Sequence, residues 1–490
     1  MTVCWFFMLS WLLSRFWDTP PPAGVRVVPC TGMDAEMADM ILTTILVVDA
    51  RLDPKKLENS VSLLVEKKFP RAGARLARRN EKYEFQIPQD FSPSTPAVSF
   101  TCSDYSEPYD SPSRPSLATL RVSKPTAPFV CQAPALWQFS RGKTCPNTVQ
   151  DLLKPNTPLV HIHVTTFNDI TFVGVTSTHA MFDAMGTKIF LHAWTRVLSG
   201  EPLDDIPGMP WDVAPFSSFA SQTFPKGWVQ RGLFKLGFIS RWLWSFRFKR
   251  RLRLDPFLVG MAICMPKAFL ERHKQDVMAE LQDAGSKEWV SSSDVLLAWL
   301  VKLCYSYRQD TTVVHMNIPS NLRERRVFPT ASGTIETPYI HNAVMPIALP
   351  PFNANTVAVT PLRDIALGFR RTILAFDANI DAIKNDLRWR CSDPTAYAYP
   401  CPPGAEYSLQ TNWRSANYTE LDFSGAVSGN LCQENLKPRV LAANGAMRTE
   451  RMRDGGAIMY ESEDCIWIAQ LKGAKQWAAI KATGSVEFKS

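Results

Sequence analysis

Two side chains four residues apart in the sequence could perform acid–base chemistry, His179 and Asp183 of the stretch HAMFD. A neutral imidazole, with an ordinary pKa near ~6.5, can remove the proton of an alcohol at neutral pH as the oxygen attacks an acyl group. Such general-base help contributes about 10²- to 10⁴-fold to a rate. A single histidine is more often a structural residue, so the chain around His179 must decide between the two interpretations.

The residues around His179 predict a hairpin of two strands that leads into a helix. Apolar and polar residues alternate over 160–165, an Asn-Asp pair then supplies turn chemistry, and a second β-rich run covers 172–175. The residues that follow are compatible with a helix, which is predicted to carry both His179 and Asp183. A junction between a strand and a helix exposes one side chain to a cleft, and we expect that side chain to be His179.

The motif and its surroundings resemble those of the BAHD-type acyl-CoA-dependent acyltransferases, whose HxxxD motif is matched by His179 and Asp183. The residue after Asp183 is Ala184, where that family usually has glycine. The stretch YTELDFSGA at 418–426 is similar to the family's DFGWG motif, with serine and alanine in place of two glycines. Further stretches that resemble family segments cover residues 42–76, 188–202, 291–303, 316–329 and 339–347.

The resemblance implies an α/β fold of two chloramphenicol-acetyltransferase-like domains, each a mixed β-sheet flanked by helices, with the active-site tunnel between them. Residues 24–206 would form the N-terminal domain and residues 257–490 the C-terminal domain, joined by a crossover linker at 207–256. An amphipathic pattern predicts one helix over 363–390, which in the family returns to the first domain. Residues 1–23 would be an apolar N-terminal extension.

The resemblance also implies roles for single residues. His179 would be the general base, whereas Asp183 would pair with an arginine and hold its loop in shape. Asp422 would likewise be structural, as a brace that closes the second domain over the coenzyme. The residues implied to contact the coenzyme are Gly186, Asn342, Phe423 and Gly425.

Composition and missing motifs exclude several other classes of protein. The 490 residues have a net charge of +8, but no compact stripe of Lys and Arg lies beside a nucleic-acid motif. This pattern argues against a nucleic-acid-binding protein. Signatures of serine hydrolases, Rossmann enzymes and NTPases are missing, and His161 and His163 lack a third metal ligand at a supporting spacing. The 11 cysteines form no Cys-x-x-Cys pair, which indicates reduced thiols in a reducing compartment. We therefore expect a cytoplasmic monomer without a metal or a bound cofactor.

Two stretches raise the question of a membrane. Residues 2–17 are apolar nearly all round and end before three prolines, which is compatible with an interfacial anchor, a helix on the protein's own surface or an uncleaved signal anchor. Residues 1–23 would then attach the protein to an intracellular membrane. Residues 241–254 interleave aromatic and basic side chains, as in a helix on an anionic membrane surface or an aromatic linker packed between the domains.

The predicted function is O-acylation, most often acetylation, of a hydroxyl on a lipophilic specialised metabolite such as a terpenoid, sterol or alkaloid. Acyl-CoA would be the co-substrate, as in the fungal O-acetyltransferases of specialised metabolism that the chain resembles. One alternative is a condensation-type enzyme that uses a carrier-protein donor, but those enzymes usually have a second histidine where this chain has Thr178. The other alternative is a non-catalytic, membrane-associated binding protein on the same fold.

Overall fold

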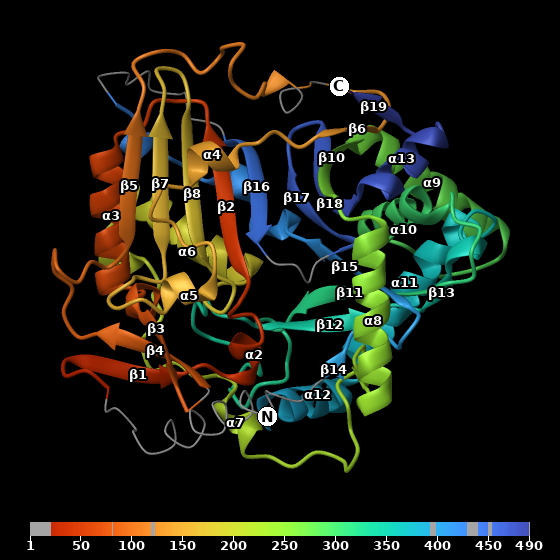
Figure 1. The fold of residues 1–490 in the computed structure, drawn as a ribbon, viewed down its shortest axis with the longest axis horizontal. Coiled ribbons are helices and arrows are strands. Elements are labelled where there is room, and N and C mark those ends of the chain that lie inside the picture. The colour runs from red at the N-terminus through yellow and green to blue at the C-terminus, as the bar shows by residue number, and fades with distance from the viewer. Residues whose placement is uncertain are drawn as a thin grey trace, which may run out of the picture.

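The computed structural model of the protein describes residues 21–80, 82–118, 122, 124–392, 398–428, 440–448 and 453–489. Most strands belong to a five-stranded or a nine-stranded sheet, which lie next to each other (Figure 1). Most of the predicted N-terminal extension, residues 1–20, lies outside the described residues. In the part of the chain that the structure describes, no helix combines the length and the apolar character needed to cross a membrane.

The five-stranded sheet contains the hairpin that precedes His179. Its order is β16 (Val440–Arg448), β2 (Ile41–Val48), β8 (Thr171–Thr178), β7 (His161–Thr166) and β5 (Ser99–Asp104). Strands β7 and β8 pair antiparallel, so the predicted hairpin is confirmed. Every residue of β2, β7 and β8 is buried, which suits their runs of β-branched side chains in the middle of a covered sheet.

The helices pack on both sides of the two sheets (Figure 1). Helix α3 (Pro54–Lys67) begins at Pro54, because the side chain of Asp53 accepts hydrogen bonds from two backbone N–H groups of its first turn. Helix α6 (Ala184–Leu198) packs against it. The remaining helices are α2 (Gly32–Ala35), α4 (Trp137–Ser140), α5 (Val149–Leu152), α7 (Ser217–Ala220), α8 (Phe238–Leu254), α9 (Lys267–Asp283), α10 (Ser292–Tyr305), α11 (Leu362–Ala378), α12 (Ile380–Ser392) and α13 (Ala474–Ala482).

The nine-stranded sheet draws mainly on the second half of the chain. Its strands are β12 (Val344–Ala348), β11 (Val313–Asn321), β15 (Glu406–Asn412), β17 (Gly455–Glu461), β18 (Cys465–Gly473), β10 (Leu258–Pro266), β6 (Phe129–Gln132) and β19 (Glu487–Lys489), with β13 (Phe352–Asn353) beside β11. The two sheets exchange a strand: β6 comes from the first half of the chain, and β16 of the five-stranded sheet comes from the second. Each half of the chain therefore contributes one strand to the sheet formed mainly by the other half.

Two small sheets complete the fold. One contains β1 (Val25–Pro29), β4 (Lys82–Pro88) and β3 (Arg75–Arg79), and the other pairs β14 (Ala398–Tyr399) with β9 (Phe234–Lys235). The predicted crossover linker at 207–256 contains α7, β9 and α8. Its basic aromatic stretch, residues 241–254, belongs to α8, a helix of 17 residues.

The single helix predicted over 363–390 is wrong, because the chain forms α11 and α12 with a break at Asn379. The side-chain oxygen of Asn379 accepts a hydrogen bond from the backbone N–H of Ala382 and so caps the second helix. The second helix reaches the first half of the chain, since Arg390 donates to the side chain of Glu36 at 3.0 Å and to the carbonyl of Gly32 at 3.2 Å.

Candidate active site

His179 lies in a tight turn between β8 and α6, so the prediction that the helix carries the whole HAMFD stretch is wrong. Strand β8 ends at Thr178, the turn covers residues 179–181, and α6 begins at Ala184. The backbone N–H of His179 donates to the carbonyl of Met40 at 2.7 Å. This bond fixes the turn against the start of β2, at the junction where His179 was expected.

Asn342 determines which nitrogen of His179 carries the proton. Its amide nitrogen donates to the carbonyl oxygen of His179 at 2.8 Å and to the carboxylate of Asp34 at 3.1 Å, so its oxygen must face the imidazole. That oxygen lies 3.1 Å from Nδ1 of His179 and can only accept. The neutral ring therefore carries its hydrogen on Nδ1, which leaves the lone pair of Nε2 available as a base.

Asp34 holds Asn342 from the other side. Its Oδ1 accepts from the backbone N–H of Asn342 at 3.2 Å as well as from the amide, and its Oδ2 accepts from the Thr31 hydroxyl at 2.9 Å. Asp34 is 2% exposed, and this burial raises the pKa of its carboxyl to about 6, against the lowering effect of its hydrogen bonds. The sequence interpretation missed this residue, although Thr-x-x-Asp at the start of α2 has the spacing of a helix N-cap motif.

Asp183 points away from His179 into a buried ion pair with an arginine, Arg323. The two side chains form two parallel hydrogen bonds of 2.9 and 3.0 Å. Asp183 is also the N-cap of α6, because its side chain accepts from the backbone N–H of Gly186 at 2.7 Å. The same carboxylate accepts from the backbone N–H of Ala343 at 2.9 Å. The carboxylate thus ties the turn after His179 to the chain segment that contains Asn342.

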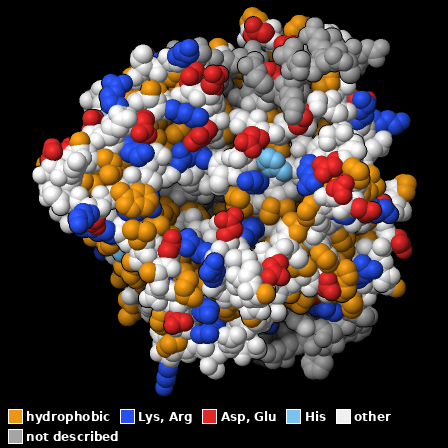
Figure 2. Space-filling model, turned by 180° about the vertical axis from the view of Figure 1, so that it is seen from behind, with side chains coloured by type: hydrophobic (Ala, Val, Ile, Leu, Met, Phe, Trp, Pro, Cys, Tyr) orange, Lys and Arg blue, Asp and Glu red, His pale blue; other side chains and the backbone are white. Residues whose placement is uncertain are grey.

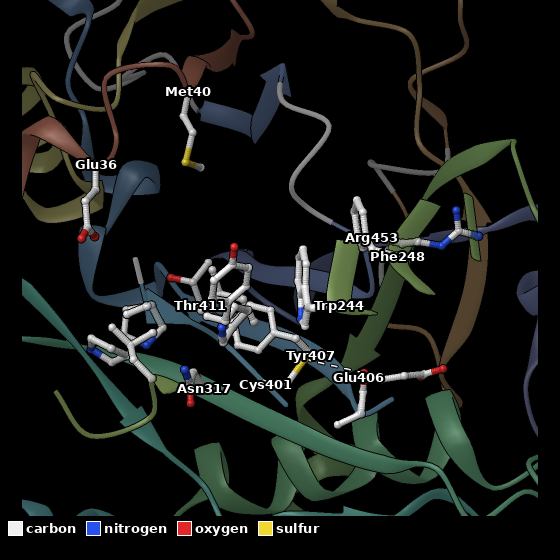
Figure 3. Close-up of a pocket in the computed structure, with 18 of the residues that line it drawn as sticks. Glu36, Met40, Trp244, Phe248, Asn317, Cys401, Glu406, Tyr407, Thr411 and Arg453 are labelled. Atoms are coloured by element: carbon white, nitrogen blue, oxygen red, sulfur yellow. Dashed lines mark hydrogen bonds between the residues drawn. The ribbon is translucent and has the colours of Figure 1, made fainter. Parts of the chain in front are cut away.

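A cavity of about 1150 Å³ has His179 in its wall. Figure 3 shows Glu36 and Met40 on one side of this cavity and Trp244 and Phe248 on the other, with Tyr407 between them. Residues of α6, α8, α12, β11, β12, β14 and β15 contribute to its wall, as do Met37 and Met40 between α2 and β2. Most of these side chains are apolar or aromatic, so the cavity suits a ligand with a large hydrophobic surface.

Thr411 and Cys401 bring a hydroxyl and a thiol into the cavity wall. The Thr411 oxygen accepts a hydrogen bond from the indole N–H of Trp413 at 3.1 Å, so its own proton can be donated elsewhere. Burial raises the pKa of the Cys401 thiol, which keeps it protonated and a poor nucleophile. Neither residue was predicted, because neither belongs to a motif that a single sequence makes recognisable.

The residues predicted to contact a coenzyme have close protein neighbours. A Cβ at Gly186 would overlap the carbonyl oxygen of Ile340, and a Cβ at Gly425 would overlap that of Leu198. Phe423 is fully buried with its ring 6.2 Å from that of Trp194, and Asn342 holds His179. The coenzyme contacts of these residues stay a prediction. Their packing against other parts of the protein is a structural role that each of them already has.

The second motif forms an irregular turn beside α3 and α6. The carboxylate of Asp422 accepts from the backbone N–H of Ser424 at 3.0 Å, and the carbonyl of Ala426 accepts from the backbone N–H of Asp53 at 2.7 Å. Because Asp53 caps α3, the motif connects the second half of the chain to the first. The bracing role predicted for Asp422 stays a prediction.

The described residues contain no cluster of three or more His, Cys, Asp or Glu that could hold a metal ion. His161 and His163 are buried on β7. Nδ1 of His163 lies 2.8 Å from the hydroxyl of Thr101 on the neighbouring strand. This contact ties the His163 side chain to the neighbouring strand β5.

Comparison with known proteins finds relatives that are named acetyltransferases or O-acyltransferases. Residues 143–209 match the model of the Transferase family. The acetyltransferase BOT5 of Botryotinia fuckeliana is 29% identical over 72% of this chain and 66% of its own length. Acetyltransferase adrJ of Penicillium roqueforti is 28% identical over 80% of each chain, and O-acetyltransferase PaAT-2 of Phomopsis amygdali is 25% identical over 93% of this chain and 97% of its own.

Solved structures show the same fold at low sequence identity. TRI101 of F. sporotrichioides, complexed with coenzyme A and T-2, has a TM-score of 0.63 and 13% identity over 93% of this chain and 97% of its own. Vinorine synthase has a TM-score of 0.60 and 14% identity over 96% of each chain. The family match, the relatives and the fold together define an acyltransferase. In sequence and in fold, the chain is similar to the BAHD-type acyltransferases.

Proposed function

We propose that the protein transfers an acyl group, most simply acetyl, from acyl-CoA to a hydroxyl group of a lipophilic metabolite. The observation that carries this proposal is the orientation of His179 in the wall of the large cavity, with Nδ1 held by Asn342 and Nε2 left as a base. The fungal relatives named acetyltransferases and the coenzyme A complex of TRI101 support acyl-CoA as the donor.

In the proposed reaction, Nε2 of His179 takes the proton of the acceptor hydroxyl as its oxygen attacks the thioester carbonyl. The carbonyl carbon becomes tetrahedral and its oxygen becomes negatively charged. Collapse of this intermediate forms the ester bond and breaks the carbon–sulfur bond, and the leaving thiolate takes the proton from His179. Asp34 and Asn342 act as positioning residues that keep the imidazole in the tautomer that this reaction needs.

The Thr411 hydroxyl is our candidate for the donor to the tetrahedral oxygen, because its own oxygen is engaged by Trp413. A covalent acyl-enzyme is not part of the proposal. The thiol of Cys401 has a raised pKa, and a protonated thiol is a weak nucleophile. Acyl-CoA and acceptor would therefore react directly in a ternary complex.

The acceptor is proposed to be a bulky lipophilic alcohol. The apolar side chains of Met37, Met40, Trp244 and Phe248 in the cavity wall would replace its hydration shell. The structure of TRI101, which has the same fold, holds T-2 together with coenzyme A, and this supports an acceptor site in the present cavity. We further propose a cytoplasmic monomer that residues 1–23 attach to an intracellular membrane.

The test is incubation of the purified protein with acetyl-CoA and a panel of hydrophobic and hydrophilic alcohols, followed by mass spectrometry. The proposal expects acetylated products from hydrophobic alcohols, intersecting initial-rate plots, and no acyl adduct on the protein after incubation with acetyl-CoA alone. Transfer only to sugars or polyamines would contradict the acceptor class, and no transfer from any acyl-CoA would contradict the reaction.

A further inference from the structure

Helix α8 is unusual because none of its 17 residues is buried. Phe238 is 78% exposed, Trp242 is 61% exposed and Phe246 is 53% exposed. These three residues are spaced four apart and therefore project from one face of the helix. The rings of Trp242 and Phe246 stack with their centroids 5.6 Å apart, which makes the face a continuous aromatic surface.

Exposed hydrophobic side chains concentrate in and just after this helix. Half of the large hydrophobic side chains that the described residues leave exposed fall within 238–258. Scattered single residues of this kind need no explanation, whereas a contiguous group marks an interaction surface. We call the group the α8 surface; its apolar members are Phe238, Ile239, Trp242, Phe246, Leu254, Phe257 and Leu258.

The charge of α8 indicates what this surface binds. The helix contains six basic residues and no acidic residue. Lys249, Arg250 and Arg253 are exposed in its second half, on the same side as the aromatic row of its first half. On the face of the molecule drawn in Figure 2, by contrast with α8, basic and acidic side chains are interspersed.

The inner side of the same helix belongs to the cavity. Trp244 and Phe248 lie in the cavity wall, and the Trp244 ring is 5.0 Å from that of Tyr399 on β14. Arg251, also on this side, forms a 2.5 Å ion pair with Asp454 and so fixes the helix to the body of the protein. One helix thus separates the cavity from the exposed aromatic and basic surface.

We propose that the α8 surface docks on an anionic membrane, with its aromatic side chains among the lipids and its cations at the headgroup phosphates. Exposed aromatic residues beside lysine and arginine are the features of helices that lie in the interface plane. A second copy of the chain would fit less well, because a symmetric contact would bring the two groups of cations together. Docking would bring the cavity close to the phase in which lipophilic alcohols dissolve.

The experiment is co-sedimentation of the full-length protein with phosphatidylcholine vesicles, with and without phosphatidylserine. The double variant Trp242→Ser/Phe246→Ser should bind the anionic vesicles about 10-fold or more weakly. The double variant Lys249→Gln/Arg253→Gln, which leaves the cavity-lining Arg250 in place, should lose roughly 5-fold per cation removed, and only on anionic vesicles. The control Trp289→Ser/Val359→Ser removes two exposed hydrophobic side chains elsewhere and should bind as the wild type does.

Equal binding of the wild type and both α8 variants would overturn the proposal. Any attachment to the vesicles would then be provided by residues 1–20 or by another surface. A concentration-dependent dimer that disappears in Trp242→Ser/Phe246→Ser would instead assign the surface to a second copy. This test does not depend on the proposed reaction, because binding is measured without a substrate. Acyl transfer to a water-soluble acceptor should be unchanged in both α8 variants, which also shows that they fold.

Discussion

The cavity has two walls built by different physical means. Around His179 the polar side chains are buried and paired, since Asp34 and Asp183 are each 2% exposed and Asn342 is fully buried. Across the cavity, α8 contributes aromatic side chains from a helix without a buried residue. The difference teaches that the wall with the proposed base has a geometry fixed by buried polar contacts, whereas the wall proposed to contact the acceptor offers mainly apolar surface.

The comparison is tested most strongly by breaking the buried ion pair of the first wall. Asp183→Ala leaves the Arg323 guanidinium buried without its carboxylate, so we expect a loss of about 3–5 kcal/mol in the free energy of unfolding. Urea denaturation measures it. The control is Lys154→Ala, which removes an exposed pair with Asp151 and should cost at most ~1 kcal/mol. Similar losses in the two variants would contradict the contrast between buried and exposed pairs.

The next effect concerns the positioning of the imidazole. Asp34→Ala removes one of the two acceptors that orient the Asn342 amide and leaves only the carbonyl of His179, so the tautomer of His179 is less firmly fixed. We expect kcat to fall about 10- to 100-fold with little change in KM. Asp34→Asn keeps one oxygen acceptor and should lose less. The ¹⁵N shifts of the His179 imidazole should report hydrogen on Nδ1 in the wild type and a mixture in Asp34→Ala; an unchanged tautomer would refute the role.

The pH dependence of stability also reports on the burial of Asp34 in the first wall. Burial raises the pKa of Asp34 from its usual 3.8 to about 6, so between these values the folded protein binds a proton that the unfolded chain has released. The contribution of Asp34 to stability is therefore full below pH ~4 and is lost as pH rises through ~6. Asp34→Asn should lack this decline in urea denaturation between these pH values. The same decline in both proteins would assign it to other groups.

The smallest effect should come from the second wall. Trp244→Ala removes aromatic surface from the cavity, and we expect KM for the acceptor to rise about 5- to 10-fold with little change in kcat. The matched control is Trp242→Ala, which removes the same ring from the outward face of α8 and should leave KM for a water-soluble acceptor unchanged. A large fall in kcat for Trp244→Ala would mean that this wall also positions reacting groups.

The sequence predicted best where local pattern determines structure. The hairpin before His179 follows from alternation and turn residues, both of which are local signals. The break at Asn379 was missed because the amphipathic pattern continues across it, whereas the capping bond that interrupts the helix has no periodicity. Resemblance to a family identified His179 and an arginine partner for Asp183.

The remaining parts of the site depend on contacts across long stretches of sequence. Asp34 and Asn342 are 308 residues apart, and Asp183 and Arg323 are 140 residues apart. No spacing rule connects such positions in a single sequence. The exchange of β6 and β16 between the two sheets is likewise a matter of tertiary pairing, which neither strand's composition reveals.

The most direct test of the central claim is the rate of acyl transfer from acetyl-CoA by full-length His179→Ala, measured in a single turnover with an alcohol that the wild type acetylates. If Nε2 of His179 is the general base, the rate should fall about 10²- to 10⁴-fold while the unfolding midpoint and coenzyme A affinity stay near those of the wild type. A variant that keeps more than about a tenth of the wild-type rate would contradict the claim, because general-base help is worth at least roughly 10²-fold.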